Sequence, residues 1–196
     1  MTPLHVESDW QHMQQGSQAA FQRIYHQHVR HLLNYGLRQN KSLSVVEDVV
    51  QETFIDLWQH CKTLREPNSV RFYLLRAVRN KLSREYRRDQ PFESGWDAPP
   101  EYPFDIEPSS EQRWIELDIA EQQRQRIETA MNALSARQRE LLYLRYFNDL
   151  AYEQICELTG LNYQSARSQV YQALKVIRTI IDSRSFPALL LLLANH

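Results

Sequence analysis

The sequence predicts an all-α protein of two small helical domains, an N-terminal helical bundle and a C-terminal helix-turn-helix domain, joined by an acidic Pro-rich linker. Apolar residues recur at helical spacings of three and four, and only 4 of 196 residues are glycine. Residues 91–120 carry one Lys or Arg against eight Asp or Glu, between two mildly basic segments. We expect domains at 1–90 and 111–184, a linker at 91–110 and an apolar tail at 185–196.

The first elements differ in the strength of their pattern. Residues 1–16 are polar and show little periodicity. A helix is predicted from about Ser17, ending between Gly36 and Lys41. The face it would bury contains Phe21, Ile24, Tyr25, His28 and Leu32.

A second helix is predicted over residues 45–61, where the apolar positions form one stripe. Ser44 and Glu47 fit an S-x-x-E capping box at its start. The opposite face carries only acids and amides, namely Asp48, Gln51, Glu52 and Asp56. Such a face is either simply solvated or a docking surface for a basic helix.

A third helix is predicted over residues 70–88, after the break at Pro67. It carries seven Lys or Arg against the single acid Glu85, more than a solvated face usually shows. Phe72 is expected in the core, and Tyr73 and Tyr86 are aromatic residues that can stack on unpaired bases. The alternative is an Arg-rich surface helix without a ligand.

The C-terminal pattern is that of a helix-turn-helix. Helical periodicity resumes near Ser110, and Ser135 with Gln138 forms a capping box before a helix at 137–147. A short helix at 152–158, a turn at Gly160 and a long helix capped by Asn162 follow. The long helix exposes side chains of the types that contact bases and phosphates: Gln164, Ser165, Arg167, Ser168, Gln169, Gln172, Lys175 and Arg178. A helical hairpin with a polar surface is the alternative.

Other classes of function find little support in the chain. No nucleophile motif, phosphate-binding glycine loop or carboxylate pair is present, so we expect neither an enzyme nor a cofactor. His28 and His31 lack further ligands at metal-binding spacing, so no metal site is expected. Cys61 and Cys156 are expected to be buried free thiols in a reducing cytoplasm. The run 188–194 is too short to span a membrane.

Three motifs in order resemble bacterial RNA polymerase sigma factors of the extracytoplasmic-function (ECF) type. They are Glu47-Asp-Val-Val-Gln-Glu-Thr-Phe-Ile-Asp-Leu-Trp58, Arg76-Ala-Val-Arg-Asn80 with the basic residues after it, and Leu134-Ser-x-Arg-Gln-Arg-Glu140 before the helix-turn-helix. The resemblance covers residues 18–182 and implies an alternative sigma factor in the cytoplasm. It would bind core RNA polymerase and direct promoter recognition, melting of the −10 element and initiation.

The resemblance also assigns residue roles. Asp48, Gln51 and Glu52, with Asp56 on the same face, would dock on the β′ clamp helices. Asn80, Lys81, Ser83 and Arg84 would hold a flipped base of the −10 element, and Tyr73 belongs to the same site. Arg76, Arg79, Arg87 and Arg88 would hold its phosphates. The acidic linker would run through the RNA path of the polymerase, and the β flap is a further expected partner.

At the −35 element, the resemblance implies contacts from Ser165, Arg167, Ser168 and Gln169, with Gln164, Gln172 and Lys175 on the same face. Three positions depart from the family, one of them Gln164, which stands where Gly is common. Ala151 stands where Ser often caps the first helix of the helix-turn-helix, which costs about 1 kcal/mol unless Asp149 substitutes. Gln169 stands where Arg or Lys is common, which shifts the base preference from guanine towards adenine.

Regulation and competing functions complete the expectations. An anti-sigma factor or a recruiting protein is expected as a further partner, and the tail 185–196 is a candidate docking segment. The leading alternative is a helix-turn-helix regulator that binds duplex DNA without the polymerase, and another is a helical protein-interaction module. The regulator alternative leaves the acidic face and the Arg-rich third helix without a purpose.

Overall fold

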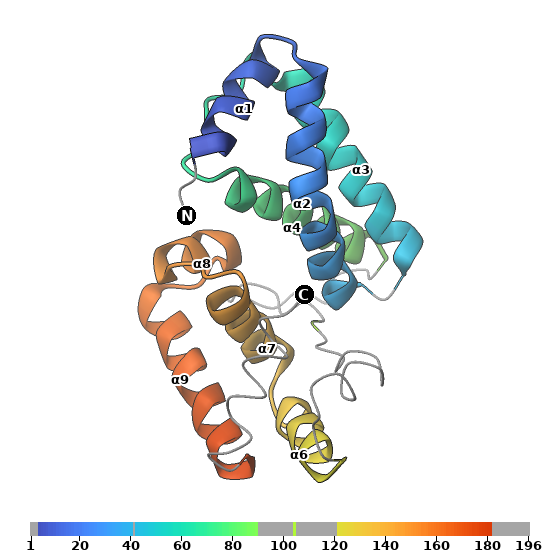
Figure 1. The fold of residues 1–196 in the computed structure, drawn as a ribbon. Helices are drawn as coiled ribbons and strands as arrows, with labels where there is room; N and C mark the ends of the chain where they lie inside the picture. The colour runs from blue at the N-terminus through green and yellow to red at the C-terminus, as the bar shows by residue number, and fades with distance from the viewer. Residues whose placement is uncertain (1–3, 41, 90–103, 105–120, 182–196) are drawn as a thin grey trace. The chain divides into compact units, whose positions relative to one another are not determined.

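The computed structural model describes residues 4–40, 42–89, 104 and 121–181 (Figure 1). All regular structure in these ranges is helical, which confirms the predicted all-α class. The chain divides into two compact units, Met1–Glu93 and Ser94–His196. Apart from residue 104, the predicted linker lies outside the described residues, as does the apolar tail. None of the described helices is long and apolar enough to cross a membrane.

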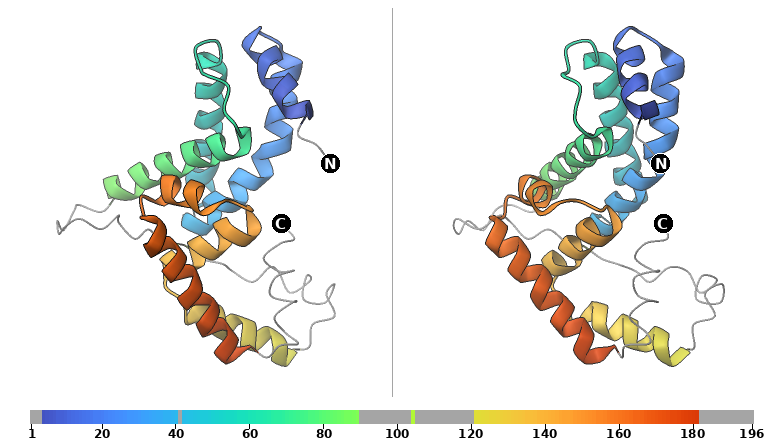
Figure 2. Two further views of the ribbon diagram at one scale, coloured as in Figure 1. Left: turned by 90° about the vertical axis from the view of Figure 1, so that its left-hand side faces the viewer. Right: turned by 60° about the vertical axis from the view of Figure 1, so that its left-hand side comes forward.

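The N-terminal unit consists of α1 (Leu4–Gln14), α2 (Gln18–Gln39), α3 (Leu43–His60) and α4 (Val70–Asp89). Helix α1 packs on α2, while α2, α3 and α4 pack against one another (Figures 1 and 2). Their shared core consists of aliphatic and aromatic side chains at most 4% exposed, among them Ile24, Leu32, Val50, Phe54, Leu74 and Val78. The predicted spans of α2, α3 and α4 are confirmed to within a few residues.

Helix α1 was missed by the sequence prediction. Trp10 and Met13 are 0% exposed, and the Trp10 ring meets Tyr73 of α4 edge-on, with ring centroids 5.7 Å apart. Gln14 Nε2 donates to the carbonyls of Cys61 and Leu64 at 3.1 and 2.7 Å. Two buried apolar side chains and Gln14 are enough to hold this helix. So few positions do not form an apolar stripe that the sequence pattern could reveal.

The predicted start of α3 is wrong, whereas the predicted end of α2 between Gly36 and Lys41 is confirmed, since α2 ends at Gln39. The first residue before α3 is Ser42, whose side chain makes no cap hydrogen bond, and Ser44 lies inside the helix. The Ser44–Glu47 capping box therefore does not form. Helix α2 continues through Gly36, which is buried because α3 passes close to it. A Cβ at Gly36 would lie 2.5 Å from Val46 Cγ1, so the glycine permits this approach.

The C-terminal unit consists of α6 (Glu121–Asn132), α7 (Ala136–Leu142), the π-helical segment η1 (Tyr143–Phe147), α8 (Tyr152–Thr159) and α9 (Tyr163–Ile180). The predicted capping box forms, since Ser135 Oγ accepts from Gln138 N and Gln138 Oε1 accepts from Ser135 N. Gly160 has φ 75° and Asn162 caps α9. The predicted helix-turn-helix is thereby confirmed.

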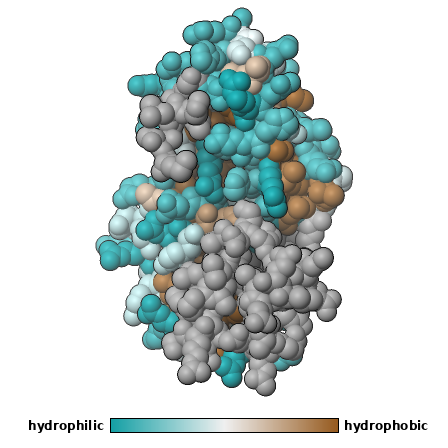
Figure 3. All heavy atoms as spheres, viewed as in Figure 1, coloured by the Kyte–Doolittle hydropathy of each residue, from teal (hydrophilic) through white to brown (hydrophobic). Residues whose placement is uncertain are grey.

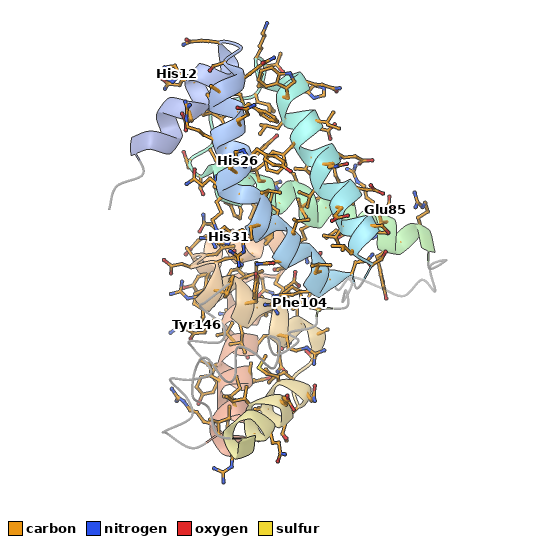
Figure 4. All side chains as sticks on the ribbon, turned by 45° about the vertical axis from the view of Figure 1, so that its right-hand side comes forward. His12, His26, His31, Glu85, Phe104 and Tyr146 are labelled. Carbon is orange, nitrogen blue, oxygen red and sulfur yellow. The ribbon has the colours of Figure 1, made fainter. Side chains whose placement is uncertain are left out.

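Phe104, within the predicted linker, belongs to the core of this unit. Its side chain is 1% exposed, and its ring centroid lies 5.5 Å from that of Tyr143 (Figure 4). Arg139 fixes the backbone there, because Nε donates to the Phe104 carbonyl at 2.8 Å. The Nη1 of the same side chain donates to the carbonyls of Met131 and Leu134. One guanidinium thus holds three separate stretches of chain together.

The cysteines fit the sequence prediction in part. Cys61 is a buried free thiol, as expected, but Cys156 is only half-buried. Partial burial, together with the nearby Glu153 carboxylate, raises the pKa of the Cys156 thiol. Because the thiolate is the reactive form, Cys156 is poorly reactive near neutral pH.

Candidate polymerase-docking and DNA-binding surfaces

The polar face of α3 is exposed as predicted. Asp48, Gln51, Glu52 and Asp56 are all exposed, while the apolar stripe behind them is buried. The structure adds Ile55, 52% exposed, which the sequence analysis did not single out. These five residues are called the docking face below. Figure 3 shows hydrophobic side chains at the surface on the side of the N-terminal unit where α3 lies.

Lys81 of α4 reaches the docking face. Its Nζ lies 2.8 Å from Asp56 Oδ2 and 3.0 Å from Glu52 Oε2. Partial burial lowers the pKa of the Lys81 ammonium, but hydrogen bonds to Asp56 and Glu52 outweigh this and raise it overall. Lys81 therefore carries its charge at neutral pH. The pattern of residues 45–61 predicted a face with no basic residue among its own members, and periodicity within one helix does not reveal a basic side chain that reaches it from α4.

A groove of about 380 Å³ lies between α3 and α4. Val45 and Val49 contribute its apolar lining. Its charged lining comes from Asp48 and Glu52 of α3 and from Lys81, Arg84, Glu85 and Arg88 of α4 (Figure 4 labels Glu85). Residues predicted for two separate tasks, docking and −10 binding, thus line one groove.

The remaining predicted −10 residues differ in accessibility. The exposed members are Arg76, Asn80, Arg84, Arg87 and Arg88, whereas Tyr73 and Lys81 are half-buried. Arg79 is only 5% exposed and the Ser83 hydroxyl is buried, so neither side chain is available to DNA here. Both positions face the helix bundle, and their DNA contacts stay predictions. Phe72 is half-buried, not a core residue, and the core places are taken by Leu74 and Leu75.

His28, His31 and Arg71 form a basic cluster in the N-terminal unit, in which His28 is buried and the other two are half-buried. His28 of α2 is 5% exposed, and its pKa falls to about 4 because of burial first, then the positive groups His31 and Arg71. Burial and the same Arg71 also lower the pKa of His31, which Figure 4 labels on α2. No group of three or more metal-ligating side chains occurs in the ranges that the structure describes. The two histidines are therefore neutral at neutral pH, with His28 in the core and His31 half-buried.

Helix α9 separates its faces clearly. Ala166, Val170, Ala173 and Ile177 are buried against the rest of the unit. On the other side Gln164, Arg167, Ser168, Gln172 and Lys175 are exposed, and Ser165 and Gln169 are half-buried. Tyr171, 68% exposed, was missed, although it lies one turn from both Arg167 and Lys175. Tyr171 follows Arg167 by four residues, and this spacing could have predicted that both lie on the same exposed face of the helix.

The start of α8 lacks a side-chain cap, as expected from Ala151. Asp149, at φ 51°, does not replace it, and the helix retains only the bond in which Gln154 Oε1 accepts from Ala151 N at 3.0 Å. An aromatic group stands beside this turn. Tyr152 and Tyr163 meet edge-on at 5.6 Å, and the Arg145 guanidinium lies 5.3 Å from the Tyr152 ring centre. This packing supports the turn in place of the missing cap.

Comparison with known proteins identifies two family regions in the chain. Residues 24–92 match sigma-70 region 2, and residues 124–177 match sigma-70 region 4. RNA polymerase sigma factor YlaC of Bacillus subtilis is 23% identical, over 82% of this chain and 92% of its own length. ECF RNA polymerase sigma factor SigL of Mycobacterium tuberculosis is 27% identical, over 85% of this chain and 92% of its own length.

Two solved structures share the fold. CnrH, in complex with the cytosolic domain of CnrY, aligns with a TM-score of 0.58 at 18% identity, covering 91% of this chain and 98% of CnrH. The sigma factor RpoE of Bartonella quintana, in complex with the anti-sigma factor NepR, aligns at 0.52 and 21% identity, covering 82% and 95%. With both family regions present in order, the chain belongs to the sigma-70 family of RNA polymerase sigma factors, in its extracytoplasmic-function group.

Proposed function

We propose that this sigma factor docks on core RNA polymerase through the docking face of α3. A sigma factor binds core polymerase and directs it to promoters, so a face for a protein partner is required. The observation that carries the proposal is the exposure of three carboxylates and one amide around the apolar Ile55. An apolar centre within a charged rim is the usual anatomy of a protein interface, and the carboxylates select a basic partner helix.

The −10 element is proposed to bind along α4. Asn80 and Arg84 are exposed and can hydrogen-bond an unstacked base, while Arg76, Arg87 and Arg88 are exposed cations suited to phosphates. Tyr73 is tied to Trp10 by ring packing and offers only part of its surface. Arg79 and Ser83 are left out of this site because their functional atoms are buried.

The −35 element is proposed to lie against the exposed face of α9. Arg167, Ser168 and Gln164 stand in the first turns of the helix, where a recognition helix reaches base edges. Tyr171 provides an apolar surface that suits a thymine methyl group. Gln172 and Lys175 extend the face towards the phosphates.

Regulation by a protein partner in the cytoplasm is part of the proposal. The similar structures contain CnrH with CnrY and RpoE with an anti-sigma factor, which supports a comparable partner for this chain. Leu43 and Ile55, 51% and 52% exposed on α3, are apolar positions that such a partner would cover. Capture from a lysate of the source bacterium, followed by competition with core polymerase, tests whether the partner and the polymerase exclude each other.

Promoter-dependent transcription with purified core polymerase tests the main proposal. Glu52→Lys is expected to weaken binding to core polymerase by at least about tenfold, because a cation would meet the basic partner. Glu66→Lys, in the loop after α3, makes the same charge reversal away from the docking face and should bind normally. Full binding by the Glu52 variant would refute the docking role. Retention of sequence-specific duplex binding without core polymerase would favour the helix-turn-helix regulator.

A further inference from the structure

Lys81 connects two surfaces that the proposed function treats separately. Its ammonium lies 2.8 Å from Asp56 and 3.0 Å from Glu52, on the docking face. Yet Lys81 belongs to α4, the helix assigned to the −10 strand. The Lys81 side chain is 23% exposed, against 64% for Glu52 and 54% for Asp56, so the carboxylates still face outward.

A basic partner and Lys81 must compete for the same carboxylate oxygens. The docking carboxylates already hold a cation in the free protein, and a partner lysine or arginine would have to share or replace it. Exposed ion pairs contribute little net stability, so the exchange is easily made when a partner brings several cations. The flexible four-carbon stem of lysine allows its ammonium to move without the helix moving.

A released Lys81 would rejoin other cations of α4. Arg84 and Arg88 line the same groove as Lys81, together with Glu52 and Asp48. A basic partner would neutralise the carboxylates that α3 contributes to the groove. The charges that remain, from α4, would then be predominantly positive. A positive groove beside exposed Asn80 is suited to a nucleic-acid backbone.

We infer that Lys81 acts as an internal occupant of the docking face, which core polymerase displaces so that Lys81 then binds a phosphate of the −10 strand. This inference rests on the proposed docking role of α3. It makes docking and strand capture thermodynamically coupled through one side chain. Since such coupling is reciprocal, DNA that holds Lys81 also strengthens polymerase binding by the same factor.

The first experiment needs no polymerase and uses the full chain with a single-stranded −10 oligonucleotide. Neutralising both carboxylates (Glu52→Gln with Asp56→Asn) should release Lys81 and steepen the salt dependence of binding by about 0.7 in log–log slope. The same double change in a Lys81→Met background should give no such increment, and Met keeps the aliphatic stem. Comparing the two backgrounds removes the general effect of lost negative charge. Equal increments in both backgrounds would overturn the inference.

The second experiment measures the affinity of each variant for core polymerase. Lys81→Met should bind about two- to fivefold more tightly, because the docking carboxylates no longer have an internal partner. Lys62→Met, after the end of α3, removes the same charge elsewhere in the unit and should change nothing. If the Glu52→Gln, Asp56→Asn variant binds more weakly but Lys81→Met binds equally or more weakly, the inference is overturned. The proposed docking face would then still stand. Unchanged binding by the carboxylate variant would instead refute the proposed docking face.

Discussion

The acidic face of α3 and the recognition face of α9 present their functional side chains in different ways. On α9, the exposed polar stripe lies opposite a buried stripe of small and β-branched residues. The helix is capped by Asn162, as predicted. On α3, two of the exposed carboxylates are held by Lys81 from the neighbouring helix. The face of α9 is described fully by its own sequence, whereas the face of α3 is completed by α4.

This difference teaches which surfaces a helical pattern can describe. Periodicity separates the buried and exposed sides of one helix, and on α9 this separation is sufficient. It does not report which neighbour a long side chain will reach. In the N-terminal unit that information decides which cations are available to DNA, since Arg79 is buried and Lys81 is paired.

The largest expected effect concerns the stability of the N-terminal unit. Trp10→Ala removes a side chain that is 0% exposed and should lower the free energy of unfolding of this unit by about 3–5 kcal/mol. Hydrogen exchange of α2 and α3 amides, followed by mass spectrometry, measures the effect. Tyr171→Ala, at a 68% exposed site of the other unit, should cost at most about 0.5 kcal/mol. Equal losses would contradict the packing of α1.

The second prediction distinguishes the units by pH. The pKa of His28 is about 4 in the folded unit against an ordinary 6.5, so the unfolded chain binds the proton first. Stability of the N-terminal unit should therefore fall as pH drops from about 6.5 to about 4, by up to about 3 kcal/mol. The described residues of the C-terminal unit contain no histidine.

Unfolding of the two units at several pH values, resolved by hydrogen exchange, checks this prediction. His28→Gln should flatten the pH dependence of the N-terminal unit, because Gln does not titrate. His60→Gln, at an exposed position at the end of α3, removes a histidine from outside the core and is the control variant. An unaltered slope in the His28 variant would assign the effect to other groups.

The third prediction concerns the recognition face of α9. Arg167→Ala should weaken holoenzyme binding to a promoter with an intact −35 element by roughly 1–3 kcal/mol. Arg126→Ala removes an exposed charge from α6 of the same unit and is the control. Titration with promoter fragments that carry or lack the −35 element measures both. Equal loss on both fragments would show that Arg167 binds phosphates without reading sequence.

The smallest expected effect tests the missing cap of α8. Ala151→Ser supplies a hydroxyl to the free amides of the first turn and should stabilise the C-terminal unit by about 1 kcal/mol. Slower hydrogen exchange in α8 and a higher Tm would show it. Ala136→Ser, inside the first turn of α7 after a complete capping box, should not stabilise the unit. A neutral result at position 151 would mean that the Gln154 bond already suffices.

Particular residues show how far the sequence could predict this protein. Gly160, Asn162 and Ser135 were predicted correctly because turns and caps are local and depend on adjacent residues. The Ser44 box failed because the chain enters α3 two residues earlier, where α2 and α3 come close at Gly36. Helix α1 and the shared ion pairs of Lys81 depend on contacts far apart in the chain, which no local pattern contains.

The hydrogen bond between Arg139 and the Phe104 carbonyl limits the length of chain between the two units. Helix α4 ends at Asp89, and the next residue that the structure describes is Phe104, whose carbonyl accepts from Arg139 in the C-terminal unit. The 15 peptide steps between them span at most about 50 Å when fully extended. That length corresponds to about 15 base pairs of straight duplex at a rise of about 3.4 Å each. These 15 peptide steps therefore set an upper limit on the distance between Asp89 and Phe104 when both units bind one promoter.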